Sequence, residues 1–273
     1  MPLTFFVLVY VVSWFWFGAA AYILRCAGSS ASGVGALLFL PGVIAPALVA
    51  IALTARSEGR AGVSQLIGGI FQWRVAPAYY VFAIAYMATI KLTSAVVYRI
   101  ANGDWPIFSA VPWYFMAGAI VISTPIQAGE ELGWRGYALP RLAKRFGLPA
   151  ASIVLGLIWA CWHLPFFFIS GGDNVGQSFP LYLIAVTAIS VAVAWLYWRT
   201  NQSLLLTMLL HASIDNTAGI VSSPAMVKNP FLLPHAWLPW ITTAMLCAAA
   251  VWFLVQMSKQ RRRTPRLSLP VFL

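Results

Sequence analysis

Residues 180–198 read PLYLIAVTAISVAVAWLYW, a run that holds no charged side chain. A helix that crosses the hydrocarbon core of a bilayer needs roughly 20 apolar residues, because it rises about 1.5 Å per residue and must satisfy its own backbone hydrogen bonds in lipid. The whole chain shares this character: of its 273 residues, 61% are hydrophobic and 8% are charged. Apolar residues in long runs, without a regular polar alternation, exclude a water-soluble domain. We therefore expect an integral membrane protein.

The same measure predicts an all-α, polytopic membrane helix bundle of about eight transmembrane helices. The expected spans lie near residues 4–24, 37–55, 77–98, 112–129, 152–169, 180–198, 203–222 and 237–257. The first span is expected to be retained, because it lacks the basic n-region of a cleavable signal. We take residues 1–258 as a single integral membrane domain and residues 259–273 as a basic cytoplasmic tail.

The formal charge of +11 is distributed as a topology signal and does not form the basic face of a nucleic-acid-binding protein. Basic residues concentrate in connections that share one side of an eight-span chain: Arg56, Arg60, Arg74, Arg141, Lys144, Arg145 and Arg199. The tail lies on that side as well. Because cytoplasmic loops carry the excess of Lys and Arg, both termini are expected in the cytoplasm, in a bacterial cell membrane. Membrane lipids are expected partners, and nucleic acid is not.

Between the second and third spans, apolar residues recur at helical spacing. They are Val63, Leu66, Ile67, Ile70 and Phe71, with Ser64, Gln65 and Gln72 on the other side. This pattern predicts a short amphipathic helix. It lies either in the membrane interface or against the end of the bundle, and the pattern favours neither position.

Acidic and imidazole side chains are scarce in this chain, which has six carboxylates and three histidines. Those in expected loops are Glu58, Asp104, Asp173 and His235. Those in or at the edge of expected spans are Glu130, Glu131, Asp215, His163 and His211. A charged side chain at the centre of a membrane helix costs about 2.5–3.5 kcal/mol, so such residues usually face the protein interior and carry function.

The first cluster is GEELGWR, residues 129–135. Glu131 and Arg135 are four residues apart and share a helix face, which favours an internal ion pair. Glu130 is turned by about 100°, so it is expected to face something else, such as a bound water or a metal. A network that only fixes helix packing is the alternative for this cluster.

Two further clusters carry the histidines. His163 stands near the middle of an apolar span, four residues after Trp159 and two before Pro165, which frees a backbone carbonyl. In the last cluster His211 and Asp215 are four residues apart, so the carboxylate either orients the imidazole or lines the same cavity. Asn216 lies one step around the helix. Each histidine on its own could also be a hydrogen-bond bridge between helices.

A carboxylate and two imidazoles around one water are the parts needed for hydrolysis. Glu130 could act as general base, while His211 with Asp215 or Asn216 stabilises the developing oxyanion. Glu130, His163 and His211 could instead hold zinc with an open position. The sequence leaves both the zinc and the metal-free mechanism open. It contains no HExxH, GxSxG or Gly-rich phosphate loop, and a serine mechanism is a poor second.

In order and spacing the three clusters resemble the motifs of the CPBP family, the CAAX protease and bacteriocin-processing (Abi) group that includes Rce1-like prenyl proteases. The family's EExxxR motif is matched by Glu130, Glu131 and Arg135. Its aromatic residue four positions before a histidine is matched by Trp159 and His163, with tryptophan in place of the usual phenylalanine. The resemblance covers about residues 112–222.

The third motif, a histidine followed four residues later by asparagine, is matched by His211 with Asp215 in place of the asparagine. The resemblance implies a helical intramembrane metalloprotease or metal-free protease that opens toward the cytoplasm and cleaves membrane-anchored peptides or proteins. Glu130 and His163 would activate the water, and His211 and Asp215 would form the oxyanion site. An aspartate that is ionised cannot donate a hydrogen bond, so Asp215 is either protonated, orients His211, or leaves the donor role to Asn216.

Two other functions compete with proteolysis. A transporter or proton relay also places Glu, His and Asp in the membrane, but it predicts repeated halves and polar residues along a path, and neither is visible here. A catalytically idle immunity or scaffold protein would not need Glu130, His163 and His211 together.

Overall fold

The computed structural model describes residues 2–27, 32–169, 174–222 and 226–263. All regular elements in these ranges are helical, as predicted. They are α1 (Pro2–Ala27), α2 (Ser32–Gly68), η2 (Gly69–Phe71), α3 (Pro77–Asn102), α4 (Trp113–Ser123), α5 (Ala128–Glu131), η3 (Leu132–Ala138), α6 (Leu139–Phe146), α7 (Leu148–Trp162), η4 (Leu164–Phe167), α8 (Phe179–Arg199), α9 (Leu204–Thr217), η5 (Ala218–Ile220) and α10 (Trp237–Arg263). The tail beyond residue 263 lies outside the described residues.

The protein is a polytopic helical membrane bundle. Within the described ranges, five helices are long and apolar enough to cross a membrane: Pro2–Cys26, Gly33–Phe71, Pro77–Asn102, Phe179–Arg199 and Trp237–Lys259. Three expected spans are instead shorter apolar helices: Trp113–Ser123, Leu148–Trp162 and Leu204–Ile220. The eight predicted segments are therefore all helical, but three of them are shorter than a full crossing.

The shorter helices and their ends change the expected boundaries around the polar residues. The span expected over 112–129 ends at Ser123, where a turn containing Pro125 begins, because proline cannot supply the next helical N–H. Glu130 and Glu131 then lie in the separate, four-residue α5, and the chain continues into η3, a π-helical turn. His163, expected near the middle of a span, is the C-cap residue that directly follows α7.

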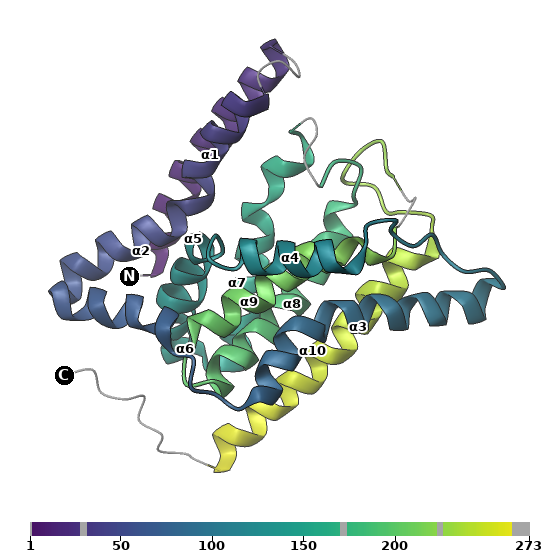
Figure 1. Cartoon of the computed structure of the whole chain (residues 1–273). Helices are drawn as coiled ribbons and strands as arrows, with labels where there is room; N and C mark the ends of the chain where they lie inside the picture. Colours follow the sequence, from purple (N-terminus) through teal and green to yellow (C-terminus); the bar gives the residue numbers. More distant parts are fainter. Residues whose placement is uncertain (1, 28–31, 170–173, 223–225, 264–273) are drawn as a thin grey trace.

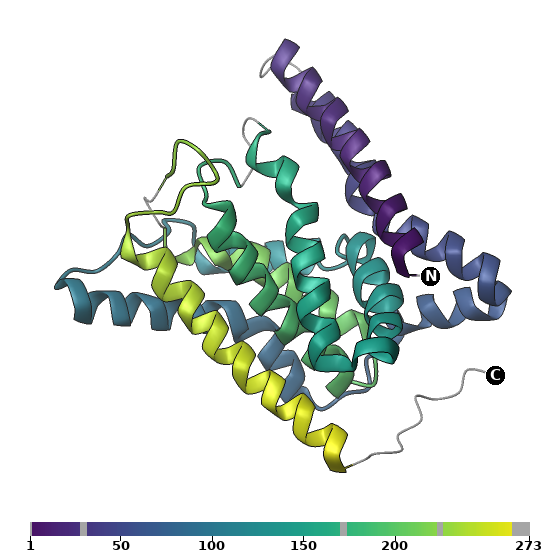
Figure 2. The ribbon, with the colours of Figure 1, turned by 180° about the vertical axis from the view of Figure 1, so that it is seen from behind.

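α8 lies at the centre of the packing. Every residue from Ala188 to Ala194 is buried, and α8 contacts α7 on one side and α10 on another. α10 also runs along α3, and α3 packs on α9, as Figures 1 and 2 show from opposite sides. The short helices α7 and α9 are thereby enclosed by longer ones.

α1 and α2 form an antiparallel hairpin that extends away from the other helices (Figure 1). Pro46 has no N–H to offer the carbonyl of Gly42, and Ser13 of α1 donates its hydroxyl to that oxygen at 2.7 Å. The hairpin is therefore joined by a buried hydrogen bond at the point where proline interrupts the α2 ladder.

α2 changes direction at Gly59, whose φ of 66° and ψ of −161° favour glycine over residues with a Cβ. The segment after this kink contains the predicted amphipathic pattern. Leu66 and Ile70 pack against the hydrophobic core, while Ser64 and Gln65 are exposed. These contacts match the alternative in which the amphipathic helix covers one end of the bundle.

Candidate active site

The three polar clusters come from different helices, and the fold brings them together. α5 and η3 supply Glu130, Glu131 and Arg135, the end of α7 supplies His163, and α9 supplies His211 and Asp215. Apart from Asp215 these side chains are buried: Glu131 and Arg135 have no exposed surface, and His211 has 4%. The structure therefore gathers the predicted site residues within the bundle.

Close packing of α2 holds the glutamate motif in place. Gly129 and Gly133 flank the two glutamates, and α2 passes directly over both glycines. A Cβ at Gly129 would lie 3.1 Å from Ile44, and one at Gly133 would lie 2.5–2.6 Å from Pro46, including its backbone. At Gly133 only glycine allows this approach, and at Gly129 a Cβ would make a tight contact, so the two glycines help to set the position of Glu130.

Glu131 accepts hydrogen bonds from two sides. Its Oε1 is 2.6 Å from Arg135 Nη1, which confirms the predicted ion pair, and 2.9 Å from His211 Nδ1. Because a carboxylate only accepts, His211 carries a proton on Nδ1 and turns Nε2 away from Glu131. His211 Nε2 lies 3.7 Å from Asp215 Oδ2, so Glu131, and not Asp215, makes the close contact that orients this imidazole.

Trp159 contacts both Glu130 and His163. Its indole N–H donates to Glu130 Oε2 at 2.8 Å, and its carbonyl oxygen is 2.8 Å from His163 Nδ1. Since a carbonyl only accepts, His163 is protonated on Nδ1, and Nε2 of the neutral ring keeps its lone pair. The Arg135 guanidinium lies 4.2 Å from the centre of the Trp159 ring, so this residue also contacts the ion pair.

The backbone carbonyls near Pro165, at the end of α7, have different partners. The Phe166 N–H donates to the carbonyl of His163. The Trp162 carbonyl accepts a hydrogen bond from the indole N–H of Trp14 in α1, at 3.1 Å. α1 is thereby attached to the turn that carries His163.

The sequence did not identify Gln127 as a site residue. Its amide Nε2 donates to Asp215 Oδ2 at 2.8 Å, across 88 residues of chain. The available signal was a polar side chain in an apolar run, three residues before Glu130 and on the same helical face. Asn216, which was considered as a donor, instead bonds through Nδ2 to Ser123 Oγ at 2.9 Å and to the Ala212 carbonyl at 2.8 Å.

The donor set proposed for zinc was Glu130, His163 and His211. In the part of the chain that the structure describes, no group of three His, Cys, Asp or Glu side chains is arranged to hold a metal. One atom of each candidate is already engaged: Glu130 Oε2 and His163 Nδ1 with Trp159, and His211 Nδ1 with Glu131. The other atoms, Glu130 Oε1 and Nε2 of both histidines, are not used in these contacts, and ligating histidines commonly bond a carbonyl or carboxylate through the second ring nitrogen. Zinc binding therefore stays a prediction.

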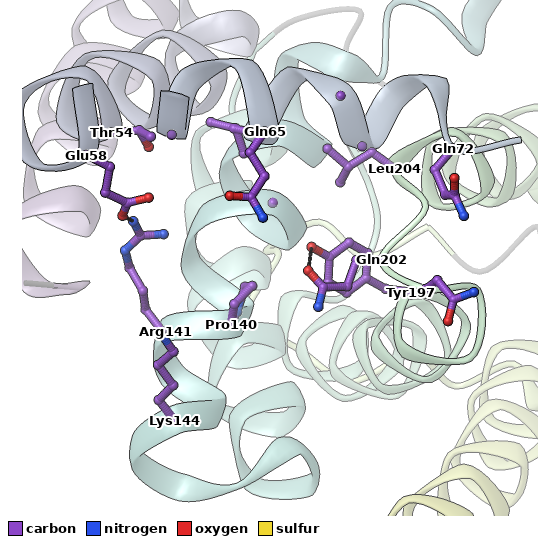
Figure 3. A pocket seen from close by; sticks show the side chains of 16 residues that line it. Thr54, Glu58, Gln65, Gln72, Pro140, Arg141, Lys144, Tyr197, Gln202 and Leu204 are labelled. Atoms are coloured by element: carbon purple, nitrogen blue, oxygen red, sulfur yellow. Dashed lines mark hydrogen bonds and ion pairs between the residues drawn. The ribbon is translucent and has the colours of Figure 1, made fainter. Parts of the chain in front are cut away.

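A separate cavity of about 330 Å³ lies between the end of α2, α6 and the connection from α8 to α9 (Figure 3). Its lining is mostly polar and includes Gln65, Gln202, Tyr197 and Lys144. Arg141 projects into the same region and is paired with Glu58, as the dashed line in Figure 3 shows. None of the candidate catalytic side chains lines this cavity, so it is distinct from the site.

Fold and site together define a polytopic membrane protein with a buried carboxylate and imidazole cluster suited to acid–base chemistry. Residues 109–217 match the family model described as type II CAAX prenyl endopeptidase Rce1-like, and all three motifs lie inside the match. The chain is also 24% identical over 230 residues to a protein named CAAX prenyl protease 2 from Methanococcus maripaludis, covering 78% of this chain and 82% of that protein. Both matches support a likeness to the CPBP/CAAX protease family.

Proposed function

We propose that this protein is an intramembrane endopeptidase that hydrolyses peptide bonds of membrane-associated peptides, using a water activated by Glu130 and His163. The observation that carries the proposal is the double contact of Trp159, which holds both residues at once. The match of residues 109–217 to the Rce1-like family model supports the reaction class. Burial supports the chemistry, because a general base enclosed by helices acts on a water that is shielded from bulk solvent.

Each polar group has a distinct part in this mechanism. Glu130 has Oε2 on the Trp159 N–H, and Oε1 is the oxygen that takes the proton of the attacking water. His163 Nε2 accepts the second hydrogen of that water and fixes its orientation. His211, oriented by Glu131, faces Asp215 and stabilises charge on the substrate carbonyl. Glu130 then returns its proton to the leaving amine.

The substrate class follows from where the site lies. A site enclosed by membrane helices suits a peptide anchored in the same membrane, either through a lipidated C-terminus or through a leader segment. The similar protein's name refers to prenylated CAAX substrates, so a prenylated peptide is the first substrate to test. With both termini cytoplasmic, the site would open to the cytoplasmic side.

The test uses the protein purified in detergent and returned to lipid vesicles, with a fluorogenic peptide carrying a prenyl or a leader anchor. Wild type is expected to cleave the anchored peptide, and Glu130→Gln is expected to abolish cleavage because the amide cannot accept the proton. Asp104→Asn is the matched control, since Asp104 is 98% exposed and lies outside the cluster of site residues. If Glu130→Gln cleaved at the wild-type rate, the mechanism would be wrong. A wild type without activity on any anchored peptide would instead support an idle scaffold.

A further inference from the structure

The developing negative charge of peptide hydrolysis needs hydrogen-bond donors, and Asp215 is not one when ionised. Its side chain is half-exposed, at 50%. An ionised carboxylate only accepts, and it would repel an oxyanion. His211, with Nδ1–H on Glu131, supplies one donor through Nε2 only as the imidazolium, which has a proton on each ring nitrogen. A second donor has to come from another side chain near Asp215.

Asn216 does not supply that donor in this structure. An amide nitrogen carries two hydrogens, and Asn216 Nδ2 has two acceptors, Ser123 Oγ and the Ala212 carbonyl. Both bonds tie Asn216 to its own helix and to the end of α4. Its donors are therefore used for packing.

Gln127 has the position and the spare hydrogen that Asn216 lacks. One hydrogen of Nε2 goes to Asp215 Oδ2 at 2.8 Å, and among the described residues the amide makes no other hydrogen bond. The same oxygen lies 3.7 Å from His211 Nε2, so the amide and the imidazole meet at one carboxylate oxygen. Gln127 is 9% exposed, and its backbone is fixed by bonds from its N–H to Ser123 and Thr124.

Gln127 also lies on the same helical face as the proposed base. It precedes Glu130 by three residues, and the Glu130 N–H donates to the Gln127 carbonyl at 3.1 Å. Side chains three residues apart on a helix are neighbours, with Cβ atoms about 5–6 Å apart. A peptide carbonyl attacked by a water on Glu130 would therefore be within reach of the Gln127 amide.

We propose that Gln127 is a catalytic residue that donates a hydrogen bond to the oxyanion, and that Asp215 acts as the acceptor that aims its amide. This inference rests on the proposed function. In the first step the water oxygen bonds to the carbonyl carbon and its proton passes to Glu130. The carbonyl π electrons move to the oxygen, which accepts from Gln127 Nε2 and His211 Nε2. When the electron pair returns, the C–N bond breaks and the amine leaves with the proton from Glu130.

The test is a double-mutant cycle between Gln127 and Asp215. Gln127→Ala is expected to lower kcat by about 10²–10³-fold with little change in KM, as for loss of one oxyanion donor. Asp215→Asn places an amide beside His211, so in that background Gln127→Ala is expected to cost about tenfold or less. Gln65→Ala, which removes an exposed amide from α2, is the control and is expected to keep wild-type activity.

A binding measurement separates the oxyanion role from a structural one. A phosphinic peptide carries a negative oxygen where the oxyanion forms, and Gln127→Ala is expected to weaken the binding of this peptide by about 10²-fold. Uncleaved substrate peptide has no such charge. It is expected to bind Glu130→Gln and the double variant Gln127→Ala/Glu130→Gln equally. Equal losses of kcat in the wild-type and the Asp215→Asn backgrounds, or unchanged phosphinic peptide binding, would overturn the inference while leaving the protease intact. If wild type and Glu130→Gln were equally inactive, the proposed function would fail and the inference with it.

Discussion

The buried ion pair between Glu131 and Arg135 leads to a prediction about folding stability. Arg135→Met removes the cation and keeps an unbranched side chain of similar length. The Glu131 carboxylate is then left with no exposed surface, and the His211 imidazole remains beside it. We expect this single change to be strongly destabilising, because it leaves an uncompensated charge in the core.

The magnitude follows from the geometry. Neither side chain of the pair is exposed, so solvent does not screen their attraction across 2.6 Å. Removing one partner of such a pair costs about 3–5 kcal/mol. Loss of the guanidinium over Trp159 adds about 0.5–2 kcal/mol. The double variant Glu131→Gln/Arg135→Met removes both charges, and we expect it to be more stable than Arg135→Met alone.

The assay is unfolding of the protein in mixed micelles with rising dodecyl sulfate, followed by the fluorescence of its 13 tryptophans. Arg99→Met is the control, because Arg99 and Asp104 are 3.9 Å apart and exposed, and such pairs contribute about 0–1 kcal/mol. The reasoning is refuted if Arg135→Met costs no more than Arg99→Met. It is also refuted if the double variant is less stable than Arg135→Met.

Three further predictions concern the site and its supports. Trp159→Phe keeps an aromatic ring but removes the N–H that bonds Glu130. Since a hydrogen bond to a charged group contributes about 1.5–3 kcal/mol, we expect kcat to fall by about 10–150-fold in the anchored-peptide assay. Gly133→Ala places a Cβ against the backbone of Pro46 and should lower unfolding stability by about 1–3 kcal/mol, whereas Gly118→Ala, with open space around it, should not. If Glu130 and His163 activate the water without a metal, peptidase activity should survive exhaustive chelation, and loss of activity that added zinc restores would contradict this mechanism.

The sequence determined the class of protein and the residues from which the candidate site is built. Apolar runs predicted every major helix, because a membrane leaves the backbone no other way to satisfy its hydrogen bonds. The spacing of four residues predicted the pair of Glu131 with Arg135, because that relation lies within one helix and needs no knowledge of the fold. The three motifs resemble those of the CPBP family, and all of them lie in the stretch that matches the Rce1-like model.

The tertiary structure decided which partner each of these residues has. Glu131 meets His211 across 80 residues of chain, and Gln127 meets Asp215 across 88. Trp159 reaches Glu130 across 29. Helical periodicity gives the face on which a side chain lies but not which face of another helix packs against it. That choice depends on close contacts, such as α2 over Gly129 and Gly133, that exist only once the bundle is assembled.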